Sequence, residues 1–165
     1  MVQFTSVGRK DSLRNVLCTG EFVVCLATES MFEQVNATGT DIPAELSEFT
    51  EVELTPEPSV TVAPPRGAES PIALECRFGH ALALGDSTVV IGRVLHVTVD
   101  AAMIRTDARG NSLPAIDRLR PPARLGRNEW STIGAEAPAF DAAGRQLTNF
   151  GRVLSAGGVR TGARL

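Results

Sequence analysis

The sequence predicts a mainly β domain with short helices, built as a small barrel or sandwich. Two long apolar segments, residues 71–84 and 87–99, have the pattern of strands and are separated by a Gly-Asp turn. A third apolar run occupies residues 21–28, and a helical spacing of apolar residues occupies residues 11–19. Together these segments predict a sheet with a short helix near its N-terminal strand.

The N-terminal segment predicts a strand followed by a helix. Residues 1–6 alternate between apolar and polar side chains, as the end of a strand does. Residues 11–19 carry apolar side chains at the i, i+3, i+4 spacing of one helix face, and Gly20 follows as a C′ residue. The apolar helix positions are Leu13, Val16 and Leu17. We therefore expect the helix to begin near Asp11.

The middle of the chain predicts one buried strand and several connecting segments. Residues 21–28 are dense in apolar side chains, which favours a strand buried on both faces. Ser30 is a possible N-cap for a short helix that extends through Val35. Residues 36–43 are rich in turn formers, and prolines confine residues 60–62 to an edge or connecting position.

The strongest pattern is a hairpin over residues 71–99. The first arm alternates, so Glu75 falls on a more polar face opposite the apolar set. That apolar set is Ile72, Leu74, Cys76 and Phe78. The second arm is apolar on both faces, which is typical of a central strand in a barrel. His96 lies in this arm, and both a site residue and a hydrogen-bonded barrel histidine fit its position.

Length and composition indicate one ordinary domain. The chain has 165 residues, of which 43% are hydrophobic and 21% charged, as in a globular protein with one core. The net charge of −3 gives no general attraction to nucleic acid or to anionic membranes. No apolar run approaches the ~20 residues of a membrane span, and the N-terminus lacks the apolar core of a signal peptide. We expect a cytoplasmic protein that binds neither nucleic acid nor membrane.

The cysteines predict buried thiols. Cys18, Cys25 and Cys76 form no C-x-x-C pair, and two of them lie inside strand patterns. His80 and His96 are the only further soft ligands. We therefore expect a reducing compartment and no metal site.

The segment between the first strand and the first helix predicts an anion site. Arg9 and Lys10 directly precede the helix, and Ser12 lies in its first turn. The unpaired N–H groups and the macrodipole of a helix start attract anions. Asp11 would compete with an anion as an N-cap, or would orient Arg9 or Lys10. The same residues also fit a capped, solvated surface helix.

A second cluster of cations surrounds the single tryptophan. Trp130 follows several arginines and could form a planar, cationic pocket wall with Arg124 or Arg127. Trp130 would equally serve to close the core. Beyond about residue 140 the sequence loses its periodicity, so we expect a domain over residues 1–140 and a loosely ordered tail over residues 141–165.

Common catalytic signatures are missing from the sequence. There is no Gly-x-Ser-x-Gly elbow, so serine hydrolysis would depend on His80 or His96. The G-x-G-x-x-G dinucleotide fingerprint is also missing. A small β-barrel with a phosphate-sized anion site at a strand-to-helix junction fits these observations.

Seven motifs, in order along residues 2–134, resemble the flavin reductase-like family. In this sequence they are Ser6-Val7-Gly8-Arg9-Lys10-Asp11-Ser12-Leu13-Arg14-Asn15, Gly20-Glu21-Phe22-Val23-Val24, Asn36-Ala37-Thr38, Glu69-Ser70-Pro71-Ile72-Ala73-Leu74-Glu75-Cys76, Leu84-Gly85-Asp86-Ser87, Ile91-Gly92-Arg93-Val94 and Arg124-Leu125-Gly126. A series of motifs is more specific than any one of them.

The resemblance implies an FMN-binding split β-barrel, usually a homodimer with the flavin near the subunit interface. It implies that Arg9, Lys10, Asp11 and Ser12 surround the flavin phosphate, with Ser6 beside them. Family members usually begin with a further strand pair and a loop that holds the ribityl chain and ring, and this chain starts just after that segment. We therefore expect a barrel that is incomplete at its N-terminus and has an open strand edge.

The function implied is an FMN-dependent oxidoreductase of the flavin reductase type, in which NAD(P)H transfers a hydride to flavin. The cofactor carries the redox chemistry, so no catalytic protein residue is expected. Arg124 and Trp130 would form a wall of the nicotinamide or substrate pocket, and a partner enzyme could accept the reduced flavin. The alternative is a non-catalytic flavin-binding or protein-interaction module.

Overall fold

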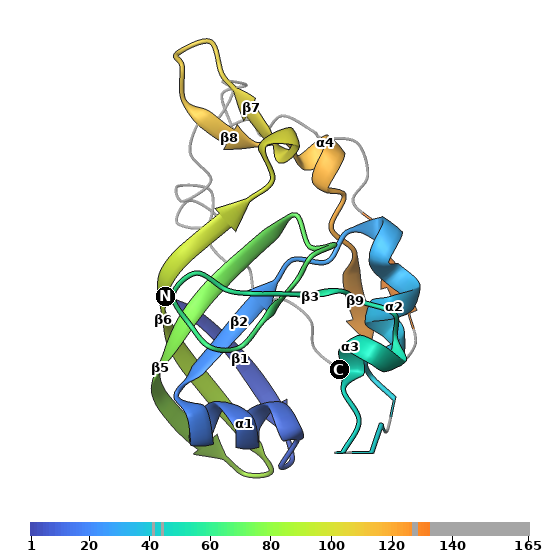
Figure 1. Ribbon diagram of the computed structural model, residues 1–165, viewed down its shortest axis with the longest axis vertical. Coiled ribbons are helices and arrows are strands. Elements are labelled where there is room, and N and C mark those ends of the chain that lie inside the picture. Colours follow the sequence, from blue (N-terminus) through green and yellow to red (C-terminus); the bar gives the residue numbers. More distant parts are fainter. Residues whose placement is uncertain (41, 44, 127–128, 133–165) are drawn as a thin grey trace, which may run out of the picture. The chain divides into compact units, whose positions relative to one another are not determined.

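The computed structural model describes residues 1–40, 42–43, 45–126 and 129–132. In this part the fold is mainly β with short helices, as predicted (Figure 1). The strands are β1 (Val2–Val7), β2 (Glu21–Cys25), β3 (Pro56–Glu57), β4 (Arg66–Gly67), β5 (Ile72–Leu84), β6 (Ser87–Val99), β7 (Ile104–Thr106), β8 (Ser112–Pro114), β9 (Ala123–Gly126) and β10 (Glu129–Ser131). The helices are α1 (Asp11–Thr19), α2 (Phe32–Ala37), α3 (Glu48–Glu51) and α4 (Ile116–Leu119), with the 3-10 helices η1 (Glu29–Met31) and η2 (Ala101–Met103).

The main sheet has four antiparallel strands in the order β1-β6-β5-β2. The central place of β6 agrees with its apolar residues on both faces. β2 lies at an edge of the sheet, and its residue Cys25 is exposed. The strand ends at Cys25 and Phe22 is its one buried residue, so the prediction of a strand buried on both faces over residues 21–28 was wrong. A run of apolar residues does not show how much of each face other segments cover.

The predicted hairpin of β5 and β6 is confirmed. Gly85 in its turn has a φ of +63°, a conformation that glycine adopts without the steric cost of a Cβ. The ladder is interrupted by register shifts between Glu75 and Cys76 and between Phe78 and His80. The first shift leaves Leu95 of β6 as the extra residue, and the second leaves Gly79 of β5, so alternation along β5 is unbroken from Ile72 to Phe78.

The main core lies between α1 and the sheet. The predicted helix 11–19 is confirmed, and Gly20 closes it in the left-handed conformation (φ +72°). Figure 1 shows α1 beside the end of the sheet where β5 turns into β6. Phe22 packs against the backbone of Gly92, where a Cβ would overlap the Phe22 ring. The buried core residues are Leu13, Val16, Phe22, Cys76 and Val90.

Two of the three cysteines differ from the prediction of buried thiols. Only Cys76 is buried, whereas Cys18 and Cys25 are exposed, and all three are free thiols. Cys18 lies on the solvent side of the amphipathic helix, and Cys25 ends an edge strand. Burial raises the pKa of the Cys76 thiol.

The segment after β2 forms η1 and α2 rather than one helix capped by Ser30. The N-cap position of η1 is Thr28, and the hydroxyls of Thr28 and Ser30 are 2.9 Å apart. Met31 is buried, whereas Phe32 is 37% exposed and contacts Trp130. These two apolar neighbours therefore divide between the interior and a surface contact.

In the described part of the chain, no helix combines the length and hydropathy that a membrane span requires. The same residues include no group of three or more His, Cys, Asp or Glu side chains placed to hold a metal ion. The expected tail over residues 141–165 and the boundary near residue 140 lie outside the described residues.

Candidate functional site

The junction between β1 and α1 is a tight turn held by backbone contacts. Gly8 has a φ of +70°, and its N–H donates to the Asp86 carbonyl in the β5–β6 turn at 2.8 Å. A Cβ at Gly8 would meet no atom within 4 Å, so conformation rather than crowding favours glycine. The turn thereby directs the chain from β1 into α1 across the tip of the hairpin.

Ser6 supports this turn from inside. Its side chain is buried, and Oγ donates to the Gly8 carbonyl at 3.0 Å. Its proton is therefore used within the turn, while its oxygen lone pairs stay able to accept. Ser6 therefore fixes the backbone of the turn that leads to the predicted anion site.

The first turn of α1 has no side-chain cap. Lys10 occupies the N-cap position with extended backbone angles, and it makes no capping hydrogen bond through its side chain. The backbone N–H groups of the first turn are thus available to a ligand, and the helix dipole adds partial positive charge there. Arg9, Lys10 and Ser12 are exposed around this helix start.

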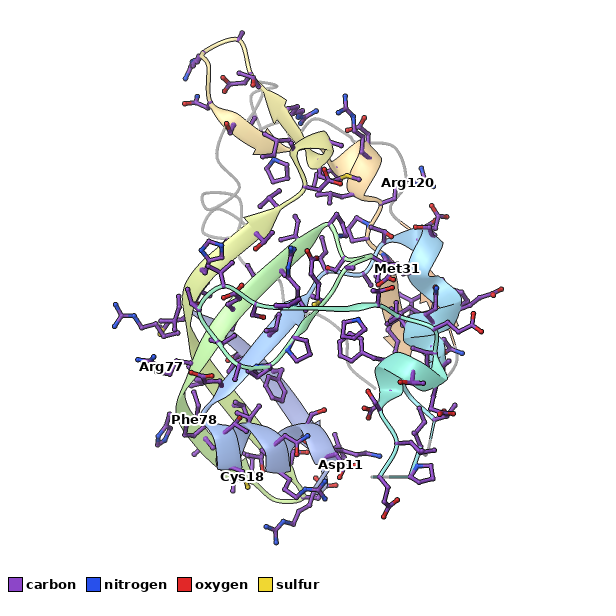
Figure 2. The ribbon with its side chains drawn as sticks, viewed as in Figure 1. Asp11, Cys18, Met31, Arg77, Phe78 and Arg120 are labelled. Carbon is purple, nitrogen blue, oxygen red and sulfur yellow. The ribbon has the colours of Figure 1, made fainter. Side chains whose placement is uncertain are left out.

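Asp11 takes neither of the two roles that the sequence suggested, an N-cap or a partner of Arg9 or Lys10. Its carboxylate forms an ion pair with Arg14 at 2.9 Å, one helical turn further along, and it does not cap the helix. Within the described residues no ion pair joins Asp11 to Arg9 or Lys10. Since i, i+3 neighbours lie on one helix face, Arg14 is the closer partner. Figure 2 shows Asp11 at the start of α1 and Cys18 near its end.

Arg124 and Trp130 come together on a different part of the chain. They are register partners in the β9–β10 ribbon, and the Arg124 guanidinium lies 5.5 Å from the centre of the Trp130 ring. Phe32 meets Trp130 edge to face, with 5.3 Å between the ring centres. The contact that we predicted between arginine and tryptophan is therefore present, and its role in a substrate pocket stays a prediction.

A pocket of about 300 Å³ opens beside this aromatic pair. A hydrogen bond from Arg120 lowers the pKa of Glu29, one of the residues in its wall. The pocket is lined by Glu29, Phe32, Pro122, Trp130, Ser131 and Thr132. None of the residues at the β1–α1 junction lines it, so the structure divides the predicted site residues between two places.

Strand alternation does not reveal the role of Glu75. Alternation predicts a polar face for this residue, yet its side chain is fully buried. Its carboxylate accepts hydrogen bonds from the Val60 N–H (2.8 Å), the Thr61 N–H (2.6 Å) and the Thr61 hydroxyl (2.6 Å). The segment that supplies these donors is distant in sequence, so no local pattern could have found it. Glu75 therefore anchors this segment to the sheet.

Several effects set the pKa of Glu75. Burial acts to raise it, but the hydrogen bonds from Thr61 and Val60, together with the charge of His96 across the ladder, outweigh burial and leave the pKa below its usual value. Glu75 is thus held as a carboxylate at neutral pH. His96 is half-buried opposite Glu75, which supports its interpretation as a structural histidine.

Comparison with known proteins decides the family. A family model described as "Flavin reductase like domain" matches residues 1–112. The chain belongs to the flavin reductase-like family. An uncharacterized protein of Aquifex aeolicus is 35% identical over 117 residues, which are 71% of this chain and 58% of that protein. The uncharacterized protein YwrF of Bacillus subtilis is 30% identical over 141 residues, 82% of this chain and 67% of that protein. The chain spans about three fifths to two thirds of the length of the curated relatives it matches.

Solved structures agree with this family assignment. Nitrilotriacetate monooxygenase component B from Bacillus cereus superposes with a TM-score of 0.74 and 28% identity, over 83% of this chain and 70% of that chain. Flavoredoxin of Desulfovibrio vulgaris superposes with a TM-score of 0.69 and 26% identity, over 86% of this chain and 75% of that chain. The fold of this flavin reductase-like chain is therefore that of the split-barrel flavin reductases and flavoredoxins, as predicted.

Proposed function

We propose that this flavin reductase-like chain binds FMN through its phosphate at the β1–α1 junction and that NAD(P)H reduces the bound flavin. The observation that carries the proposal is the uncapped start of α1 with two exposed cations beside it. Backbone N–H groups and cationic side chains are the donors that a phosphate monoester requires. Family membership supports flavin rather than another phosphate ester as the ligand.

The residues at this junction fit the phosphate. Arg9 and Lys10 would neutralise its charge, and the Ser12 hydroxyl and the first-turn N–H groups would donate hydrogen bonds. The Asp11 carboxylate is already paired with Arg14, which reduces the repulsion that a second anion would meet. Ser6 would hold the Gly8 carbonyl in place and so preserve the turn.

When bound, FMN supplies the redox chemistry by accepting a hydride from NAD(P)H. The chain contributes binding, orientation and exclusion of water rather than a nucleophile. Arg124 and Trp130 would form one wall of the nicotinamide or substrate pocket, where the flat indole and the guanidinium offer a planar, cationic surface.

We also propose a cytoplasmic homodimer with flavin near the subunit interface. The three free thiols fit a reducing compartment. The name of the Bacillus cereus protein, a monooxygenase component, supports a further proposal: a partner enzyme accepts the reduced flavin.

The binding proposal is tested by Arg9→Ala, with FMN fluorescence quenching as the assay. Loss of one charge-assisted phosphate contact should weaken FMN binding about tenfold or more. Arg77→Ala is the matched control, because Arg77 is an exposed arginine on β5. Equal effects of the two substitutions would refute the assignment of the anion site.

The redox proposal is tested by following the loss of NAD(P)H absorbance after FMN is added to the purified chain. Oxidation that requires both protein and FMN supports a flavin reductase, in which the cofactor carries the hydride. FMN binding without oxidation would refute the reductase and leave a flavin-binding module. A chain that takes up no FMN would refute both.

A further inference from the structure

Two pockets of the described chain adjoin at Glu29. The first is the pocket of about 300 Å³ beside Phe32 and Trp130, which we call the aromatic pocket. The second, of about 400 Å³, lies between η1 and the end of α4, and we call it the arginine pocket. It is lined by Thr28, Glu29, Ser30, Arg118, Leu119 and Arg120. Because Glu29 belongs to both walls, one ligand can extend from one pocket into the other.

Glu29 and Arg120 fix the boundary between these two pockets. The Glu29 N–H donates to the Arg120 carbonyl at 3.0 Å, and Arg120 Nε donates to Glu29 Oε2. Figure 2 shows Arg120 beyond the end of α4. Neither wall contains a residue of the β1–α1 junction, so both pockets are separate from the proposed FMN phosphate site.

The arginine pocket offers donors that a ligand can reach. Arg118 is exposed, and the Arg120 side chain is 51% exposed. Arg118 donates to the Ala102 carbonyl through Nη1 at 2.8 Å. Arg120 reaches Glu29 through Nε. The remaining N–H groups of the two side chains can donate to a ligand, because each guanidinium carries several.

The charge of the arginine pocket favours an anion. Its wall holds two guanidinium groups and one carboxylate. A larger pocket of about 440 Å³, which shares Arg118, has two guanidinium groups and three carboxylates, so an anion is attracted to the arginine pocket instead. The Thr28 and Ser30 hydroxyls lie 2.9 Å apart, and a single proton between them leaves the second hydroxyl proton for the anion. Guanidinium and hydroxyl groups together suit a phosphate.

The aromatic pocket suits a flat ring. Phe32, Pro122 and Trp130 form its apolar wall, and Phe32 meets Trp130 edge to face. Flat rings pack favourably on such side chains, either offset or edge to face. The Glu29 carboxylate and the Thr132 hydroxyl belong to the same wall and can accept hydrogen bonds from an amino group on the ring.

We propose that the two pockets together bind a phosphorylated nucleoside, with its planar ring in the aromatic pocket and its phosphate on Arg118 and Arg120. An NH₂ group on the ring donates to Glu29. Adenine and nicotinamide nucleotides both carry such a group, so they share this chemistry, and the test distinguishes them. The proposal goes beyond the flavin phosphate site and does not depend on it.

Trp130 reports on this site, because it is the only tryptophan of the sequence and lines the aromatic pocket. AMP, adenosine, nicotinamide mononucleotide and nicotinamide riboside are each titrated into the purified full chain, and quenching of tryptophan fluorescence gives each affinity. At least one phosphate ester should bind about tenfold more tightly than its nucleoside, through charge-assisted hydrogen bonds. Preference for AMP identifies an adenine nucleotide, and preference for the mononucleotide identifies a nicotinamide nucleotide. No quenching by either ester, or equal affinity of both esters and their nucleosides, would overturn the proposal.

Arg118→Gln supplies the decisive variant, because glutamine removes the charge and keeps a polar side chain. Affinity for the phosphate ester should fall about tenfold, while affinity for the nucleoside should stay unchanged. Arg93→Gln is the matched control, since Arg93 is an exposed arginine on β6 that lines neither pocket. Equal effects of the two substitutions would overturn the proposal. An equal loss of affinity for ester and nucleoside in Arg118→Gln would do so as well, because it would assign Arg118 a structural role through the Ala102 carbonyl.

Discussion

Substitution of Glu75 by glutamine tests whether a buried carboxylate anchors the segment around residue 60. The carboxylate accepts three hydrogen bonds through both of its oxygens. Glutamine has one acceptor oxygen and one NH₂ group. In either orientation of the amide, the NH₂ group would face a backbone N–H of Val60 or Thr61, and that hydrogen bond would be lost. Hydrogen bonds to a charged group contribute about 1.5–3 kcal/mol each, so we expect a loss of about 2–4 kcal/mol in the free energy of unfolding.

The effect of Glu75→Gln should depend on pH with a definite sign. The pKa of Glu75 is lower in the folded chain than in the unfolded chain. Its stabilising contribution is therefore fully present above the unfolded pKa of about 4.3 and is lost as the pH falls through the folded pKa. The difference between wild type and variant should be largest at pH 7 and shrink below about pH 4.

Urea unfolding at several pH values, followed by circular dichroism, measures this difference. Glu69→Gln is the matched control, because Glu69 is exposed and bonds to Thr55 at the surface. We expect a much smaller loss for that variant. Equal losses in the two variants, or a Glu75→Gln difference that does not change with pH, would contradict the anchoring role of the carboxylate.

Three further predictions concern the core and the turns. Gly92→Ala should lower the free energy of unfolding by about 1–3 kcal/mol or more, because the added methyl group would meet the Phe22 ring. Urea unfolding measures this loss. Gly67→Ala is the control, because a Cβ at that position makes only ordinary contacts. Gly8→Ala should lower the free energy of unfolding by about 1 kcal/mol, because alanine at this position would have to adopt a positive φ. If the variant is as stable as the wild type, the turn relaxes to another conformation and the prediction is wrong. A thiol reagent should label Cys18 in the native chain and Cys76 only after unfolding, since Cys76 is buried with a raised pKa; equal rates would contradict its burial.

The sequence by itself determined the elements whose signals are local. The hairpin over residues 71–99 and the helix over residues 11–19 follow from periods of 2 and 3.6 within single segments. The anion-binding candidates from Ser6 to Ser12 are contiguous, so one turn brings them together. The contact between Arg124 and Trp130 could also be predicted from the sequence, because the two residues are near in sequence and belong to one β-ribbon.

Only the tertiary structure decided the features that depend on distant segments. Glu75 is buried because residues 60 and 61 lie across its face of the sheet, although alternation along β5 places it opposite the core residue Cys76. Asp11 pairs with Arg14 rather than with its neighbours Arg9 and Lys10. The two pockets that adjoin at Glu29 join segments that no periodicity connects. Periodicity describes the faces of one segment, whereas burial depends on which other segment covers each face.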